Sequence, residues 1–436
     1  MSRHSIAIAL VLLVLLGTWG FRHALDSRHA IPGNTAPGVS GPNTAFCPRF
    51  GLNPPQRVPG LRDVISITFK ESRLVAIDRQ GNVWTYERGE SNCSDPVPVK
   101  VFASSTATKL YPTAGLPRSA QRNAVLMNGQ ALVALGLEFQ DPCGPAGKDC
   151  IAPHTAGLDN VIAVAAGDRH MLLARHDGSL WSSGMNDCGQ LGRQAGSDLV
   201  RDFDRVPDMT DIISAAAGKR SSMALDGSGT VWTWGSLSNP LLSSTTARPV
   251  AGSPYCPYQD TEWAGHRLSG ERNDNPRKVD GLPRIRQISS YYATDLALDT
   301  EGQVWGWGFN SCGQLGMNPG KGPDRIEYYI EQPRRVDGLP PIRSIASGQR
   351  HSLALDGDGR VWAWGENADT ELGQRLDLSK EGSPACGNEY GRGELAPFTP
   401  VPRQVPGIGK AVAIAAGYNS SAAIDEHGDV WVWGRH

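Results

Sequence analysis

The stretch Asp358-Gly359-Arg360-Val361-Trp362-Ala363-Trp364-Gly365 decides the fold, because it returns near the end of the chain as His427-Gly428-Asp429-Val430-Trp431-Val432-Trp433-Gly434. In both copies a glycine stands three residues before a tryptophan, and large and small side chains then alternate. Alternating residues on either side of a glycine turn are typical of a β-hairpin. The same spacing can be followed along the rest of the chain.

A turn glycine stands three residues before a large apolar residue seven times: Gly81/Trp84, Gly129/Leu132, Gly178/Trp181, Gly229/Trp232, Gly302/Trp305, Gly359/Trp362 and Gly428/Trp431. In four units an inner glycine lies eleven residues earlier: Gly167, Gly218, Gly348 and Gly417. Four short strands in a repeat of about 50 residues fit one blade of a β-propeller. The sequence therefore predicts an all-β fold, a seven-bladed β-propeller with four-stranded blades. The second unit is the most degenerate, and the number seven depends on it.

The last unit ends just after its third strand, so its outer strand is missing there. An unmatched segment of the outer-strand type, Gln56–Leu61, precedes the first unit. Pairing of Arg57–Gly60 with Val430–Trp433 would cover the open sheet edge. We therefore expect the N-terminal outer strand to close the ring.

Other elements recur at fixed distances from these hairpins. Gly348–Leu355 precedes the hairpin of the sixth unit, and Asn186–Gly192 and Asn310–Gly316 follow the third strands of their units. Together these elements resemble the regulator of chromosome condensation repeat over about residues 57–434. The resemblance, taken here to the bacterial exported branch of that family, implies a seven-bladed propeller that binds proteins.

The first 45 residues differ in kind from the repeats. Within residues 1–30, Ser5–Phe21 carries no charge and has an apolar centre at Ile6–Leu16. This length suits the core of a signal peptide that is cleaved after Gly20, and an uncleaved membrane anchor is the alternative. Residues 31–45 are rich in Pro, Gly, Asn, Ser and Thr, which predicts a flexible linker before a propeller at 46–436. We expect a periplasmic or secreted protein, or one anchored to the inner membrane by this segment.

The charges are nearly balanced, with 42 basic and 44 acidic residues and a formal net charge of −2. No block of five or more Lys or Arg residues is present. A nucleic-acid partner is therefore not expected, and membrane contact is expected only through an uncleaved anchor.

The candidates for catalysis and metal binding have simpler explanations. His170 and His351 share one repeat position, so they fall in separate blades, and buried polar roles explain them better than a general base or a metal. Asp356–Gly359 and Asp226–Gly229 resemble the start of a calcium loop but lack its final glutamate, and hairpin turns account for them. We predict no catalytic residue, no metal and no cofactor, and hence a protein that is not an enzyme.

The eight cysteines favour disulfides in an exported chain. Cys188 and Cys312 hold one repeat position, and Cys256 and Cys386 lie 68 and 74 residues later in long insertions. This symmetry predicts the pairs Cys188–Cys256 and Cys312–Cys386, and leaves Cys143–Cys150 and Cys47–Cys93. A zinc site is the alternative, although no Cys-x-x-Cys motif is present.

Three long insertions occupy the same connection of their units: Ser236–Asn275, Phe309–Gln332 and Glu366–Thr399. They carry aromatic and arginine residues of the kind that anchor interfaces: Tyr255, Tyr258, Trp263, Arg272, Tyr328, Tyr329, Tyr390 and Arg392. Because they leave one connection, we expect them on one propeller face, as a site for a protein partner whose identity is unknown. The alternative is that they only pack over the rim.

The favoured function is a non-enzymatic protein-binding scaffold of the cell envelope. The family resemblance implies two alternatives: a secreted inhibitor of a hydrolase such as a β-lactamase, and guanine-nucleotide exchange on a small GTPase. An export signal and the lack of a basic tail speak against exchange activity.

Overall fold

The computed structural model describes residues 54–70, 73–86, 97–103, 107–111, 125–128, 131–134, 160–194, 199–236, 262–263, 266–267, 273–319, 329–376, 385–387 and 395–435. All of them belong to the second of two compact units, Pro48–His436. The predicted signal peptide or anchor and the linker lie outside the described residues. Within the described part of the chain, no helix has the length and apolar character needed to cross a bilayer.

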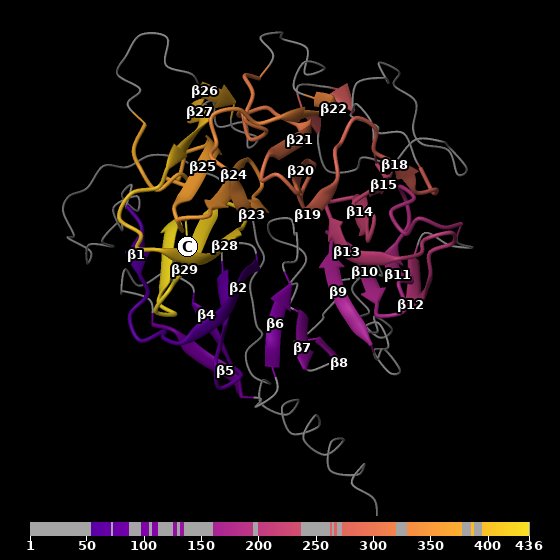
Figure 1. Ribbon diagram of the computed structural model, residues 1–436, viewed down its shortest axis with the longest axis horizontal. Coiled ribbons are helices and arrows are strands. Elements are labelled where there is room, and N and C mark those ends of the chain that lie inside the picture. The colour runs from indigo at the N-terminus through magenta and orange to yellow at the C-terminus, as the bar shows by residue number, and fades with distance from the viewer. Residues whose placement is uncertain are drawn as a thin grey trace, which may run out of the picture. The chain divides into compact units, whose positions relative to one another are not determined.

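Every regular element of the described residues is a β-strand, and six sheets form four-stranded propeller blades (Figure 1). Each blade is named here by its innermost strand. The β2 blade contains β2 (Val64–Lys70), β3 (Arg73–Asp78), β4 (Asn82–Tyr86) and β5 (Val99–Ala103). The β9 blade contains β9 (Val161–Ala166), β10 (His170–Arg175), β11 (Leu180–Met185) and β12 (Leu199–Arg205). The β13 blade contains β13 (Ile212–Ala217), β14 (Ser221–Asp226), β15 (Val231–Gly235) and β18 (Arg277–Lys278).

The remaining blades follow the same order. The β19 blade contains β19 (Ile285–Tyr291), β20 (Thr294–Asp299), β21 (Val304–Phe309) and β22 (Tyr329–Arg335). The β23 blade contains β23 (Ile342–Ser347), β24 (His351–Asp356), β25 (Val361–Glu366) and β27 (Leu395–Gln404), with β26 (Ala385–Gly387) as a fifth strand. The β28 blade contains β28 (Ala411–Ala416), β29 (Ser420–Asp425), β30 (Val430–Gly434) and β1 (Gln56–Arg57).

The prediction of seven four-stranded blades is not met. The second unit forms a three-stranded sheet of β6 (Ala107–Tyr111), β7 (Val125–Asn128) and β8 (Ala131–Ala134), in which β6 contacts both β2 and β9. This unit has Leu132 where the others have tryptophan, and Arg118 stands in place of the inner glycine, which two other units also lack. The degenerate sequence thus corresponds to the one sheet that shows no outer strand among the described residues.

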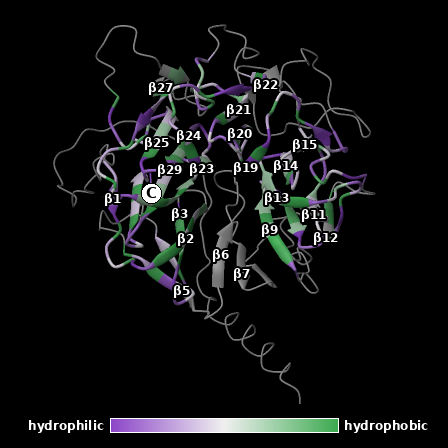
Figure 2. Ribbon diagram, viewed as in Figure 1, coloured by the Kyte–Doolittle hydropathy of each residue, from purple (hydrophilic) through white to green (hydrophobic). Residues whose placement is uncertain are grey.

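Small and apolar side chains explain how the blades pack. Innermost strands such as β28 are built largely from alanine, which lets backbones crowd together at the centre of the ring. The second tryptophan of each Trp-x-Trp strand is buried against the preceding blade, as Trp364 is against Leu296 and Leu298. Figure 2 shows hydrophobic residues concentrated in strands such as β9 and β13. The second tryptophans of these strands are therefore core residues between neighbouring sheets.

The ring is closed as expected. In the β28 blade, β1 pairs antiparallel with β30, with Gln56 opposite Val432 and Arg57 opposite Trp431. The Arg57 guanidinium forms an ion pair with Asp429, and the Val58 amide donates to the Val430 carbonyl at 2.8 Å. The first described strand therefore supplies the outer edge of the last blade.

The three long insertions all leave the connection between the third and the outer strand of their blades. They run from β15 to β18, from β21 to β22 and from β25 to β27. The first contains the short hairpin of β16 (Glu262–Trp263) and β17 (His266–Arg267), and the third contains β26. The shared connection puts their starting points at the same end of each blade, as predicted.

Candidate functional site

A recurring loop after the third strand shapes the end of the blades from which the insertions leave. Its three described copies are Asn186–Gly192, Asn310–Gly316 and Asn367–Gly373. In the second copy the Asn310 side chain accepts from the Leu315 amide at 3.0 Å and donates to the Met317 carbonyl at 3.1 Å. Asn186 and Asn367 make the corresponding pairs of bonds. One asparagine therefore fixes the shape of each loop.

Each loop also binds the next blade through one backbone carbonyl, at the fifth loop residue. That carbonyl accepts from a buried tryptophan indole and a buried serine hydroxyl of the following blade. The bonds run from Trp234 and Ser222 to Gln190, from Trp364 and Ser352 to Gln314, and from Trp433 and Ser421 to Glu371, at 2.7–2.9 Å. The loop is therefore a junction between blades.

The two repeat histidines belong to these junctions. His170 Nε2 lies 2.8 Å from Ser222 Oγ, and His351 Nε2 lies 2.9 Å from Ser421 Oγ. Because each serine gives its proton to the loop carbonyl, it accepts from the imidazole, so the histidine acts as a donor rather than a base for that serine. Burial lowers the pKa of His351 to about 4, which keeps the ring neutral. The structure supports the structural interpretation of both histidines.

Asp356–Gly359 and Asp226–Gly229 form hairpin turns, as expected. Asp356 accepts from the backbone amides of Asp358 and Arg360 through Oδ1, and from the Trp362 indole through Oδ2. Asp226 is bound in the same way, so both of its oxygens are used by the turn and the third strand. Burial pushes the pKa of Asp226 up, but hydrogen bonds from Ser228 and Trp232 outweigh it and leave the pKa below its ordinary value.

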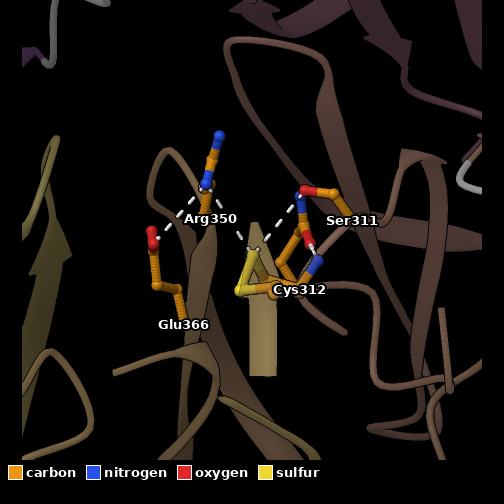
Figure 3. Close-up of a disulfide and its surroundings, with 6 residues drawn as sticks. Ser311, Cys312, Arg350 and Glu366 are labelled. Carbon is orange, nitrogen blue, oxygen red and sulfur yellow. Dashed lines mark hydrogen bonds and ion pairs between the residues drawn. A yellow bond between two sulfur atoms is a disulfide. The ribbon is translucent and has the colours of Figure 1, made fainter. Parts of the chain in front are cut away.

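The Cys312–Cys386 disulfide is present, with a Cα–Cα distance of 5.3 Å. It joins the loop of the β19 blade to β26, which belongs to the β23 blade. Figure 3 shows Arg350 and Ser311 both directed at the sulfur of Cys312. Arg350 also pairs with the carboxylate of Glu366, with Nη1 3.5 Å from Oε1. The predicted staple between blades thus lies within a buried polar cluster.

The other cysteine pairings stay predictions. Cys188 is buried at the equivalent junction, where Arg220 Nη1 lies 3.8 Å from its sulfur and 3.4 Å from Asp187. Its predicted partner Cys256, like Cys47, Cys93, Cys143 and Cys150, lies outside the described residues.

Of the eight proposed partner-binding residues, the structure describes two. Tyr329 begins β22, opposite Phe309, and is half-buried, whereas Trp263 lies in β16 opposite His266. The remaining six lie outside the described residues: Tyr255, Tyr258, Arg272, Tyr328, Tyr390 and Arg392. Their role as one surface therefore stays a prediction.

Sequence reasoning missed two buried acids. Glu371 stands where the other loops have Gln190 and Gln314, and burial, together with the charges of Glu366 and Asp369, raises its pKa well above the ordinary value. Asp295 stands where other blades have the junction serine, and burial raises its pKa to about 6 against a hydrogen bond from Ser290. An alignment of the repeats on one another would have exposed both substitutions.

Comparison with known proteins agrees with this architecture. The RCC1-like domain family matches residues 124–436. This chain belongs to the RCC1-like domain family. Among curated relatives, the RCC1 domain-containing protein RUG3, mitochondrial, of Arabidopsis thaliana is 28% identical over 298 residues, covering 59% of this chain and 62% of RUG3. The guanine nucleotide exchange factor SRM1 of Saccharomyces cerevisiae is 25% identical over 349 residues, covering 63% of this chain and 69% of SRM1.

Among solved structures, that of Prp20p from Saccharomyces cerevisiae, described with its binding properties to Gsp1p and histones, aligns with a TM-score of 0.56. It has 17% identity and covers 85% of this chain and 82% of Prp20p. At this identity the likeness supports the fold alone. This RCC1-like chain spans less than two thirds of the length of RUG3.

Proposed function

We propose that this RCC1-like propeller is a non-enzymatic protein-binding scaffold whose partner face is the end of the blades that bears the three insertions. The observation that carries the proposal is the fixed base beneath those insertions. Each described loop is held by an asparagine and bonded to the next blade, and one insertion is also tied to its neighbour by the Cys312–Cys386 bond. A rigid base that presents variable loops is a common arrangement for binding sites.

The relatives support a binding role. SRM1 is named as a guanine nucleotide exchange factor, and the Prp20p structure is described with binding to Gsp1p and histones. Those partners belong to those proteins, and they make exchange on a small GTPase the second candidate function here. Release of labelled GDP from a panel of small GTPases, measured with and without this protein, distinguishes exchange from passive binding.

Two further features belong to the proposal. We take the β6–β8 sheet as the seventh blade, because β6 contacts the innermost strands on either side of it. We also take the chain to act in the periplasm, outside the cell or at the outer face of the inner membrane, on the strength of Ser5–Phe21. Protease digestion of intact spheroplasts tests the location: protection of the propeller until the membrane is lysed would refute it.

The binding proposal is tested by affinity capture from envelope extracts with the full chain. The test variant carries Tyr328→Ala and Tyr329→Ala in the second insertion. The control carries Ile213→Ser, at a half-exposed position at the start of β13, beside the hairpin turns and away from the insertion ends. A partner that is lost with the tyrosine variant and kept with the control supports the proposal. Equal recovery of every partner by both variants removes this insertion from the site.

A further inference from the structure

The two sulfurs of the Cys312–Cys386 bond have different surroundings. Ser311 Oγ lies 3.7 Å and Arg350 Nη1 lies 3.9 Å from the Cys312 sulfur, and both can donate to it (Figure 3). Among the described residues, no hydrogen-bond donor contacts the Cys386 sulfur. Cys312 is fully buried, whereas Cys386 is 4% exposed and lies in β26, the last strand of its sheet. Two donors thus face the sulfur of Cys312, whereas Cys386 lies on the edge strand of its sheet.

We propose that this disulfide is a thiol-exchange site whose co-reactant is a dithiol, either a small molecule or a protein. A thiolate of the dithiol attacks the Cys386 sulfur, the S–S bond breaks, and Cys312 leaves as a thiolate. The second thiol of the reagent then attacks the mixed disulfide and releases Cys386. Two electrons and two protons pass to the protein, and the dithiol becomes a disulfide. The reverse sequence restores the bond.

Charge explains why Cys312 is the leaving sulfur. A thiol of low pKa leaves faster in exchange, and a neighbouring guanidinium stabilises the thiolate. The Glu366 carboxylate lies within 4.8 Å of both sulfurs, and its ion pair with Arg350, at 3.5 Å, compensates its charge and anchors the guanidinium beside Cys312. Ser311 adds a neutral donor from the same loop.

The repeat supplies an independent observation. The third residue of each loop faces one side chain of the next blade. Where the third residue is cysteine, that side chain is an arginine: Arg220 faces Cys188, and Arg350 faces Cys312. At the junction with Asp369 it is Asn419, whose amide donates to the carboxylate at 2.7 Å. Arginine therefore faces this loop position where it is cysteine, although Arg220 and Arg350 each also pair with a carboxylate, that of Asp187 and that of Glu366. This pattern fits a guanidinium kept for the thiolate state.

Access comes through β26. It is held by three residue pairs to β27, with Cys386 opposite Ala396 in the middle, and by the disulfide itself. A short edge strand opens locally at much lower cost than the whole domain. Exchange at Cys386 thus requires β26 to separate from β27, and reduction would break the covalent link between β26 and the loop of the β19 blade.

The test uses the full folded chain with excess dithiothreitol at neutral pH, quenching with a thiol alkylator and quantifying the Cys312 and Cys386 peptides by mass spectrometry. We expect Arg350→Gln to slow opening about threefold or more, and Arg350→Lys to restore most of the rate, because lysine keeps the positive charge. The matched control is Arg220→Gln, which should leave the rate at Cys312–Cys386 unchanged.

A second measurement identifies the attacked sulfur. Brief treatment with glutathione should trap the mixed disulfide on Cys386. Adducts on Cys312 would overturn the assignment. The proposal also fails if the bond opens only at the global unfolding rate, measured in parallel by tryptophan fluorescence, or if Arg350→Gln and the parent open at equal rates. None of these outcomes depends on the proposed partner.

Discussion

The loops Asn310–Gly316 and Asn367–Gly373 have the same backbone role and different chemistry. In both loops, an asparagine side chain accepts a hydrogen bond from a backbone amide of the same loop. In both, one backbone carbonyl accepts from a tryptophan and a serine of the next blade. The first has Cys-Gly-Gln where the second has Asp-Thr-Glu, and only the first is joined to an insertion by a disulfide. The hydrogen bonds to the next blade are therefore the same in the described loops, whereas the three central residues of the loop differ.

Removal of the shared contact should have the largest effect. Trp433→Ala deletes a fully buried indole that packs on Leu353 and Leu355 and donates to the Glu371 carbonyl at 2.7 Å. We expect a loss of about 3–5 kcal/mol in the free energy of unfolding, measured by denaturant titration. Trp364→Ala at the other junction should cost a similar amount. A large difference between the two would show that the junctions are not equivalent.

Removal of the disulfide should come next. Cys312→Ser with Cys386→Ser opens a link between residues 74 positions apart, and we expect a loss of about 2–4 kcal/mol. The same titration measures it, with and without reductant. Reductant should lower the free energy of unfolding of the parent. It should not lower that of the double variant through this bond, because the variant lacks it. A double variant as stable as the oxidised parent would contradict the prediction.

The acid at the second loop gives a pH-dependent effect. Glu371 Oε2 accepts from the Asp369 amide at 2.9 Å, as Gln314 accepts from Cys312, and Oε1 has no hydrogen-bond partner among the described residues. Its raised pKa means that the folded state holds the proton more tightly than the unfolded state does. The stability from Glu371 is therefore full below the ordinary glutamate pKa and is lost as the pH rises through the folded-state value.

Glu371→Gln removes this titration and keeps the shape. The variant should gain stability relative to the parent as the pH rises from 4 to 8, by on the order of 1–3 kcal/mol. Gln314→Glu is the reciprocal change and should introduce the same pH dependence at the first loop. Parallel stability curves for parent and Glu371→Gln over this range would rule out a buried proton on Glu371.

The smallest effect concerns the backbone. Thr370 adopts φ 65°, a left-handed conformation that a β-branched residue rarely takes, where the first loop has Gly313 at φ 73°. Thr370→Gly should stabilise the protein by about 1 kcal/mol through relief of this strain. Gly313→Thr should destabilise it more strongly, because a Cβ there would lie 2.9 Å from Pro400 Cα. Thermal unfolding of both variants gives the signs.

Much of the fold was predictable because the same residue types recur at the same spacing in successive units. The glycine-to-tryptophan spacing located the hairpins, the missing outer strand located the closure by Gln56–Arg57, and the shared position of Cys188 and Cys312 predicted the Cys312–Cys386 bond. The three-stranded sheet at β6–β8 was missed, because spacing alone counted the second unit although its side chains had diverged. Arg350 and Glu371 were missed because their importance comes from contacts between blades. The spacing within one unit does not show which residue of the next blade will contact a given loop residue.

The closure of the ring has a consequence for how the chain is assembled. The contact between Arg57 and Asp429 spans 372 positions of sequence, so the strand at one end must wait for the last hairpin before it finds its place. During synthesis β1 has no sheet to join, and the β28 blade is the final one to be completed. Such a distant pairing is expected to form late and slowly. Until β1 pairs with β30, the β28 blade keeps an unpaired strand edge that is open to a chaperone or a protease.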